Sequence, residues 1–282
     1  MREIKRLNDK LKKELREYLV RDLRKNVLYL YDLDKEYPSR ADFFILKENE
    51  RLKGFGVVWA DNPNFSYLHL IAENENDFLD LLTYSIKEGY INKVKRIIIP
   101  IEYSSFVEKI LRIPGEPLDL MYLKKGDEKE LKIKHYVRRL GNDDITNITN
   151  LLREFVELYL SEDEKEFGKG IIKSVENSVN NGLFFGCFIN NELASFVRAN
   201  VTYPPFVFID TLYTRKNLQR MGAAISVVSA LIEELFYKRE EFNEIQLYEM
   251  SNNLPAHDLY SRLGFKILKK FMRYSNINKN YY

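Results

Sequence analysis

The residues best suited to chemistry lie in the last third of the chain, where a strand-like run leads into a turn of small residues. Gly222, Ala223 and Ala224 carry little or no side chain, so a ligand can approach the main chain there. The apolar residues of 225–236 then recur at helical spacing. Because the first N–H groups of a helix lack partners within the helix, this turn favours binding of an anion such as a phosphate.

A second chemically suggestive segment, residues 253–265, reads as a short helix. Pro255 stands where the first helical turn tolerates proline, and Gly264 supplies a C-terminal stop. Tyr260 lies on the apolar stripe of this helix. A phenol, whose ordinary pKa is ~10, is able to act as a general acid; a core tyrosine is the alternative. Asn253 is either a ligand contact or the helix N-cap.

The two segments together resemble the GNAT superfamily of N-acetyltransferases. Gln219-x-x-Gly222-x-Ala224 is similar to the superfamily turn (Gln or Arg)-x-x-Gly-x-(Gly or Ala), and residues 253–265 are similar to Asn-x-x-Ala-x-x-x-Tyr-x-x-x-Gly-Phe. They occur in family order and at a family-like interval. The resemblance implies acetyl-coenzyme A (acetyl-CoA) as cosubstrate. Its pyrophosphate would be held by the turn residues Gln219, Arg220, Met221, Gly222, Ala223 and Ala224.

The resemblance also assigns roles around the reacting thioester. Main-chain groups of Leu212, Tyr213 and Thr214 would contact the pantetheine arm and the thioester carbonyl. Asn253 would contact the pantetheine arm, and Tyr260 would protonate the leaving thiolate. The turn departs from the family pattern at Arg220 and Met221, where glycine and a basic residue are usual. The positive charge has moved by one position.

A general base is harder to identify from the sequence. Asp210 is a carboxylate within the apolar strand 206–212, where desolvation would raise its pKa toward a useful range. A structural aspartate at a strand bulge, or a base acting through a chain of waters, are alternatives. We expect His257 to be a surface residue.

Composition excludes several other classes of protein. The 282 residues contain 44 Lys plus Arg and 42 Asp plus Glu, so no bulk attraction to nucleic acid or an anionic membrane is expected. One cysteine, Cys187, and three histidines make an intramolecular disulfide impossible and a metal site improbable. No apolar run approaches the length of a membrane span, and we expect a cytoplasmic protein.

An internal repeat predicts two similar α+β units, each a mixed, mostly antiparallel sheet flanked by helices. Residues 44–55 and 185–196 both read as strand, polar turn and strand, at an offset of 141, and the offset continues to Leu68 and Ile209. We place the units at 1–127 and 131–282, on either side of a charged run. In the first unit the turn of small residues is missing, because residues 76–82 read as a directly capped helix start.

The favoured reading is an N-acetyltransferase that moves an acetyl group from acetyl-CoA to a primary amine of a small molecule or a protein. Glutamates and aspartates within 151–181, among them Glu154, would suit a cationic acceptor, although a solvated helix face explains them equally well. Two alternatives remain open. One is an aminoacyl-tRNA-dependent transferase built from paired GNAT-like units, and the other is a non-catalytic module that binds acyl-CoA or a protein.

Overall fold

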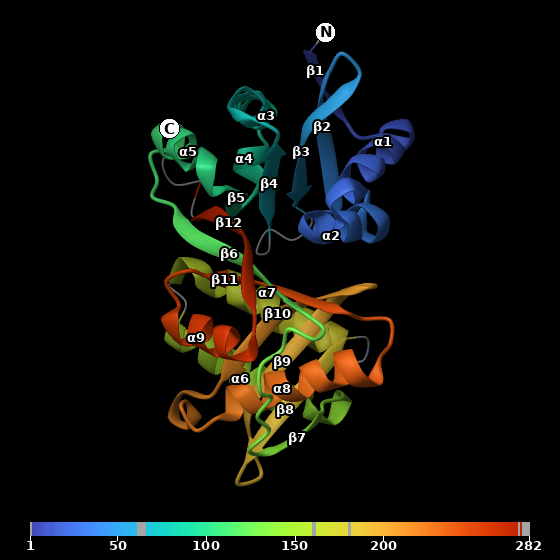
Figure 1. Cartoon of the computed structure of the whole chain (residues 1–282). Coiled ribbons are helices and arrows are strands. Elements are labelled where there is room, and N and C mark those ends of the chain that lie inside the picture. The colour runs from blue at the N-terminus through green and yellow to red at the C-terminus, as the bar shows by residue number, and fades with distance from the viewer. Residues whose placement is uncertain (1, 61–65, 160–161, 180–181, 276, 278–282) are drawn as a thin grey trace. The chain divides into compact units, whose positions relative to one another are not determined.

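The computed structural model describes the chain except residues 1, 61–65, 160–161, 180–181, 276 and 278–282 (Figure 1). It forms two compact units: unit 1 is Met1–Leu118 with Lys269–Tyr282, and unit 2 is Asp119–Leu268. These bounds differ from the expected 1–127 and 131–282 because the last strand adds to the sheet of unit 1. No helix in the described part of the chain is long and apolar enough to cross a membrane.

Unit 1 is built on a sheet with the order β1-β2-β3-β4-β5-β12. Neighbouring strands run antiparallel except β4 and β5, which are parallel. The strands are β1 Arg2–Arg6, β2 Ala41–Glu48, β3 Arg51–Trp59, β4 Tyr67–Ala72, β5 Arg96–Pro100 and β12 Lys266–Ser275, and the α-helices are α1 Asp9–Leu19, α2 Leu23–Tyr31, α3 Glu75–Lys87, α4 Tyr90–Lys93 and α5 Ser104–Leu111.

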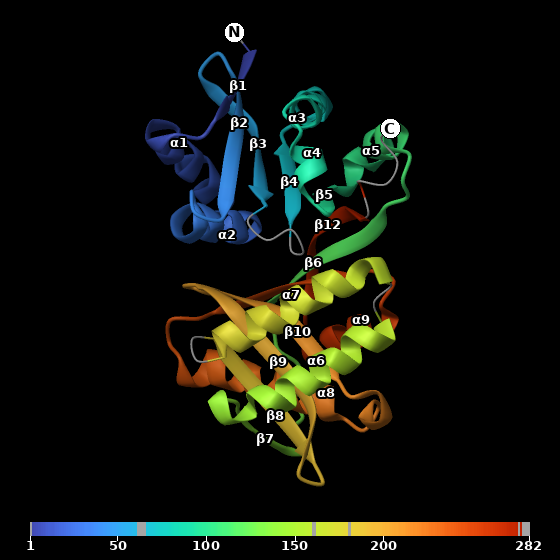
Figure 2. The same ribbon diagram turned by 180° about the vertical axis from the view of Figure 1, so that it is seen from behind.

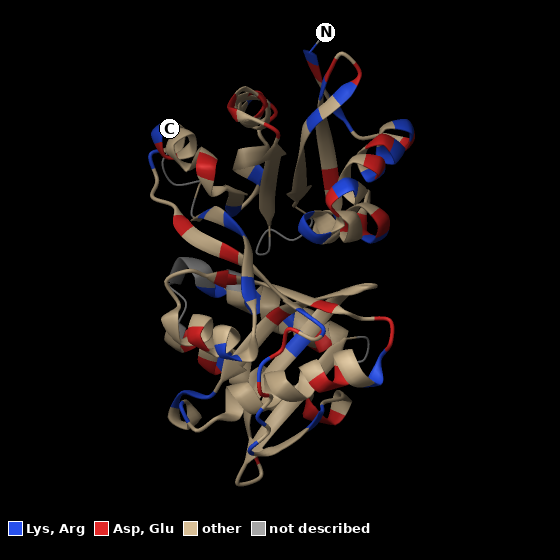
Figure 3. Cartoon of the chain, viewed as in Figure 1, with Lys and Arg blue, Asp and Glu red and all other residues tan. Residues whose placement is uncertain are grey.

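Aromatic rings join the helices of unit 1 to its sheet. On one face the ring of Tyr29 on α2 meets Phe55 edge-on, with centroids 5.2 Å apart. On the other face Phe44 stacks on Tyr90 of α4 at 5.3 Å. Lys and Arg are interspersed with Asp and Glu along α1 (Figure 3).

A buried polar cluster lies beneath α2 in unit 1. Asp32 is 1% exposed, and the Tyr67 hydroxyl lies 3.5 Å from its Oδ2 atom. Burial raises the pKa of Asp32 to about 8. Burial also lowers the pKa of His69, whose Nδ1 lies 3.1 Å from the Tyr29 hydroxyl, to about 3. Both side chains are therefore neutral near pH 7 in the folded chain.

Unit 2 has the sheet order β6-β11-β10-β9-β8-β7. β10 and β11 are parallel, and the pairs β10–β9, β9–β8 and β8–β7 are antiparallel. Helices α8 and α9 cover one face (Figure 1), and α6 and α7 cover the other (Figure 2). The strands are β6 Glu116–Lys124, β7 Tyr136–Arg139, β8 Leu183–Ile189, β9 Glu192–Tyr203, β10 Phe206–Thr214 and β11 Glu244–Met250, and the α-helices are α6 Ile145–Tyr159, α7 Glu162–Ser178, α8 Ala223–Glu233 and α9 Leu254–Leu263.

The predicted repeat is present in the backbone. The turns β2–β3 and β8–β9 each place two successive non-glycine residues at positive φ, residues 49–50 in unit 1 and 190–191 in unit 2. This is the twist that two-residue hairpins favour. Leu68 pairs with Val58 on one side and with Ile97 on the other. Ile209, at the same offset of 141, pairs equivalently with Ala199 and Leu247. Two α+β units with mixed sheets are thus confirmed.

Candidate functional site

The site of unit 2 begins where β10 and β11 separate. Their parallel pairing runs from Phe206 to Ile209, whereas β10 stays paired with β9 as far as Thr214. β11 itself continues to Met250. The main chain of residues 210–214 therefore has no strand partner on its β11 side. Unpaired N–H groups in such a gap are available to a ligand.

A β-bulge at Asp210 reverses the faces of the sheet to which the following side chains of β10 point. Ile209 pairs with Ala199 and Thr211 with Arg198, so Asp210 has no opposite residue. Ile209 packs toward α8, and so does Leu212, while Tyr213 packs toward α6. Without the extra residue the alternation of a strand would put Leu212 on the α6 face. The predicted contact residues 212–214 lie directly after this bulge, within the unpaired stretch.

Asp210 is held by a bidentate ion pair. Arg198 Nε donates to its Oδ1 at 2.8 Å, and Arg198 Nη2 lies 2.7 Å from its Oδ2. The guanidinium is 6% exposed and also donates to Ser174 and Ser178 of α7. Burial raises the pKa of Asp210, although Arg198 opposes the rise. The structural alternative, an aspartate at a bulge, is thus seen directly, and the role of Asp210 as base stays a prediction.

The predicted phosphate turn precedes α8, and its geometry fits an anion. Gly222 is the N-cap residue at φ +90°, and no side chain caps the helix. A Cβ atom at Gly222 would lie 3.5 Å from the nearest atom, Lys134 Cδ, so the main chain is open. Arg220 has φ +63°. Gln219 is exposed, and its Nε2 donates to the Thr214 carbonyl at 3.3 Å, which closes the turn.

Two basic residues that the sequence reasoning missed lie beside this turn. The segment before β7 runs along α8, because Lys134 N donates to Ser226 Oγ at 3.0 Å. The next residue, His135, places Nε2 2.8 Å from the Met221 carbonyl. Lys134 and His135 therefore join Arg220 around the uncapped end of α8. The basic run 132–135 was the signal in the sequence, but only tertiary contact brings it to the turn.

Tyr260 lies on α9 as predicted, and its ring is in the core. It is 3% exposed and packs edge-on against Phe265 with centroids 5.3 Å apart. No described residue hydrogen-bonds its hydroxyl. Burial raises the pKa of Tyr260, and the negative charge of Glu249 raises it further. The phenol is thus neutral across the physiological range and keeps its proton for a ligand.

Glu249, near the end of β11, is the most informative residue that the sequence reasoning missed. Its Oε1 accepts hydrogen bonds from Asn253 Nδ2 at 2.9 Å and from Met250 N at 3.0 Å. In the described residues nothing donates to Oε2. Burial raises the pKa of Glu249 despite these bonds. Asn253 occupies the N-cap position of α9 without capping it, and its side chain positions Glu249 instead.

His257 is paired with a buried carboxylate. Its Nε2 lies 3.0 Å from Oδ2 of Asp119 on β6, whose side chain is 3% exposed. The other oxygen, Oδ1, is buried and has no hydrogen-bond partner within the described part of the chain. His257 is therefore a part-buried member of a polar cluster with Asp119 and Glu249, rather than the expected surface residue. Nothing near Asp119 in the sequence signals this contact.

Glu154, one of the acidic residues considered for acceptor binding, instead stabilises the end of β10. It accepts hydrogen bonds from Tyr213 Oη at 3.1 Å and from Lys216 N at 2.8 Å, and it pairs with Arg215. The four acidic side chains at 162–166 lie outside the described residues. The described carboxylate of Glu154 is therefore structural.

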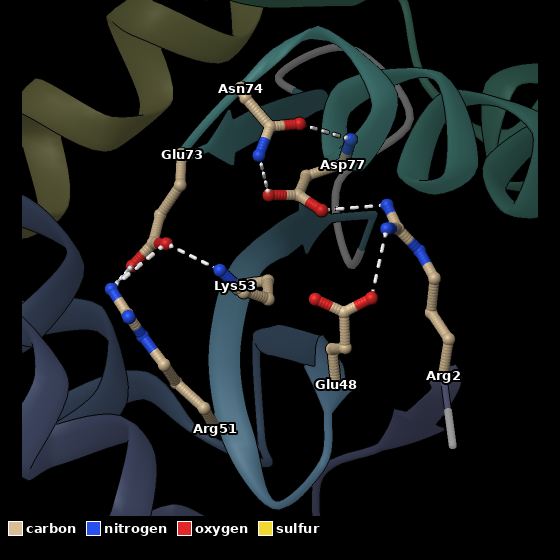
Figure 4. A network of polar contacts seen from close by, with 7 residues as sticks. All are labelled: Arg2, Glu48, Arg51, Lys53, Glu73, Asn74 and Asp77. Carbon is tan, nitrogen blue, oxygen red and sulfur yellow. Dashed lines mark hydrogen bonds and ion pairs between the residues drawn. The ribbon is translucent and has the colours of Figure 1, made fainter.

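The equivalent position in unit 1 is filled by the protein itself (Figure 4). Only residues 73–74 separate β4 from α3, whereas residues 215–222 separate β10 from α8. Asn74 caps α3 by accepting from Asp77 N at 3.0 Å, and Arg2 donates to the buried Asp77 carboxylate at 2.6 Å. The predicted capped helix start is confirmed, and the cap and the Asp77 carboxylate occupy the end of α3.

Comparison with known proteins agrees with a candidate site in unit 2. The model of the acetyltransferase (GNAT) family matches residues 146–265. The chain is similar in structure to a tandem GNAT protein from the clavulanic acid biosynthesis pathway, with 10% identity, 98% of both chains covered and a TM-score of 0.63. It is also similar to a GNAT-family acetyltransferase from Colwellia psychrerythraea, with 13% identity, 97% of this chain and 99% of that chain covered, and a TM-score of 0.56. No curated protein matches the sequence.

At these identities the structural likeness shows the fold, and the family match supports acyl transfer as the general class of reaction. The match falls on the unit with the open turn, the strand gap and Tyr260. The match to the acetyltransferase (GNAT) family model thus covers residues 146–265 of unit 2, and the whole chain shares the fold of the tandem GNAT protein.

Proposed function

We propose that unit 2 transfers an acetyl group from acetyl-CoA to a primary amine. The observation that carries the proposal is the uncapped N-terminus of α8 next to a strand whose parallel partner ends its pairing at Ile209. The first feature suits a pyrophosphate, with Arg220, Lys134 and His135 as nearby basic groups. The second provides unpaired main-chain N–H groups for the pantetheine arm and the thioester carbonyl.

Two side chains supply the proton transfers. The amine gives a proton to Glu249, whose Oε2 is available and whose pKa is raised. The nitrogen then attacks the carbonyl carbon and forms a tetrahedral intermediate. As the C–S bond breaks, the thiolate accepts the phenolic proton of Tyr260, the second proton on nitrogen passes to the tyrosinate, and Glu249 releases its proton to solvent. Asp210 is the second candidate base. Glu249 is favoured because both oxygens of Asp210 are bound to Arg198.

The acceptor is proposed to be an amine that binds as a cation. Glu249 and Asp119 give the polar cluster with His257 two carboxylates, and the Asp119 Oδ1 atom has no partner among the described residues. A buried unpaired carboxylate oxygen is costly, so an ammonium donor close to it is favourable. A small diamine or the amino terminus of a peptide meets this requirement.

The proposal is tested by measuring the binding of acetyl-CoA to the whole chain. A fragment of residues 131–282 is unsuitable, because residues 271–275 of β12 pair with β5 of unit 1 and would lose their sheet. Gly222→Asp places a carboxylate at the proposed pyrophosphate site, and we expect affinity measured by calorimetry to fall at least ~100-fold, since a desolvated like charge costs several kcal/mol. Gly89→Asp is the matched control, at φ +69° with no neighbouring atom within 4 Å.

Unaltered affinity in Gly222→Asp would remove the cofactor assignment. A second measurement follows coenzyme A release with a panel containing putrescine, lysine and a peptide amino terminus. Tight binding of acetyl-CoA without release in the presence of any of these amines would favour the binding-module alternative.

A further inference from the structure

Unit 1 contains a pocket of about 270 Å³ that the proposed reaction of unit 2 does not use. It lies among the start of α2, the end of β4 and β12, and all its lining residues belong to unit 1. This volume is near the lower end of the range for small-molecule sites. The pocket is separate from the network of Figure 4 except for Glu73, which contributes to both.

Some charged side chains of the pocket have ion-pair partners among the described residues and others do not. Its two carboxylates have partners: Asp22 is 2.7 Å from Lys25 Nζ, and Glu73 accepts from Arg51 at 3.2 Å and from Lys53 at 3.1 Å. The remaining cations, Arg21 and Lys269, form no ion pair with any described residue. With Lys25 they give the lining three cations against two carboxylates. The pocket therefore has an excess of one positive charge.

Lys269 is the more unusual of the two unpaired cations. It lies on β12 with its ammonium 5.4 Å from the Phe271 ring centroid. Desolvation lowers the pKa of Lys269, and the nearby carboxylates Glu102 and Asp22 act on it from beyond ion-pair distance. A half-buried ammonium without a counter-ion is unfavourable in the free protein, and an anionic ligand would remove that cost.

Three aromatic rings, with Asn26 and Ile71, form the rest of the pocket lining. Phe271 and Tyr29 are 1% and 2% exposed. Tyr18 also lines the pocket, with the Arg21 guanidinium 5.8 Å from its ring centroid. Aromatic lining together with two cations that have no ion-pair partner among the described residues suits a ligand that has a flat apolar body and one negative group.

We propose that this pocket binds a small aromatic carboxylate, with its carboxylate at Lys269 and Arg21 and its ring against Phe271, Tyr29 and Tyr18. The excess of one positive charge matches a monoanion. Inorganic phosphate supplies the charge but no group for the aromatic walls. Unit 1, whose α3 terminus is filled by its own side chains, thus keeps a binding site of a different kind.

The test uses the whole chain and calorimetry with phenylacetate, its neutral isostere 2-phenylacetamide, and inorganic phosphate. For a ligand of about ten non-hydrogen atoms we expect a phenylacetate Kd on the order of 0.1–1 mM. The amide and phosphate should bind at least ~10-fold more weakly, because each lacks one of the two recognised features. Lys269→Met should weaken phenylacetate binding by at least ~10-fold, and Lys269→Arg should retain most of it.

Lys270→Met is the matched control, because Lys270 is the exposed neighbour on the same strand and does not line the pocket. We expect phenylacetate affinity within about twofold of the original chain in this variant. Equal affinity in Lys269→Met, equal binding of the amide, or no saturable phenylacetate binding by the folded chain up to 10 mM (about tenfold above the expected Kd) would each overturn the proposal. None of these outcomes depends on acetyl-CoA binding in unit 2.

Discussion

Replacing Tyr260 by phenylalanine should separate catalysis from stability. The ring is 3% exposed and packs on Phe265, and phenylalanine keeps that packing. Since no described residue hydrogen-bonds the hydroxyl, its removal leaves no protein group without a partner. We therefore expect the free energy of unfolding to change by less than about 1 kcal/mol. Acetyl-CoA affinity should also stay within about threefold, because the hydroxyl acts on sulfur only as charge develops.

The expected loss of turnover is much larger. General acid catalysis contributes ~10²–10⁴-fold, or about 2.7–5.4 kcal/mol of barrier. Burial and Glu249 raise the pKa of Tyr260, which makes it a weak acid toward a thiolate. We therefore expect the lower half of that range, about 10²–10³-fold in kcat.

The assay follows coenzyme A release with a thiol reagent, at a saturating amine and under single-turnover conditions so that chemistry limits the rate. Tyr274→Phe is a contrasting control. The Tyr274 hydroxyl donates to the Ser104 carbonyl at 3.1 Å, and the ring is fully buried in unit 1. This control should lose about 1 kcal/mol of stability while keeping turnover. A Tyr260→Phe rate within threefold of the original chain would show that Tyr260 is only a core residue.

Three further predictions concern carboxylates. Glu249→Gln keeps the Oε1 acceptor but loses the base, so kcat/KM should fall ~10²–10⁴-fold. In the original chain the acid limb of the pH profile should lie above the ordinary glutamate pKa, and in the variant it should disappear. An unchanged acid limb would exclude Glu249 as the base. Asp210→Asn leaves the buried Arg198 without its counter-ion and should lower the free energy of unfolding, measured in urea, by about 2–3 kcal/mol. This is less than for a fully buried ion pair, because the Asp210 side chain is 28% exposed. A stable but inactive variant would instead restore Asp210 as the candidate base. Asp32, with a pKa of about 8, binds a proton that the unfolded chain releases, so the stability of unit 1 should fall as pH rises from about 6.5 to 8. Unfolding is measured by the fluorescence of the single tryptophan, Trp59. Asp32→Asn should flatten this pH dependence, and an unaltered slope would assign it to another group.

The sequence by itself determined the features that depend on local geometry. Glycine at 222 and 264 marks positions of positive φ, and both occur there in the structure, at +90° and +103°. Helical spacing placed Tyr260 on the buried face of α9. The hairpin repeat at an offset of 141 predicted two similar units. The glycine and helix signals involve residues within one or two turns of each other, and each copy of the repeat is itself a local hairpin, so backbone sterics and side-chain periodicity act directly.

Only the tertiary structure decided which distant residues meet. Glu249 is distinguished from other glutamates by burial beside Tyr260, and Asp119 reaches His257 across 138 residues of sequence. The partner of Asp210, Arg198, comes from the neighbouring strand through a bulge that no single residue type signals. The last strand joins unit 1, although it follows unit 2 in the chain. Strand pairing and burial are set by the free energy of the whole fold, so these contacts are not encoded in any local pattern.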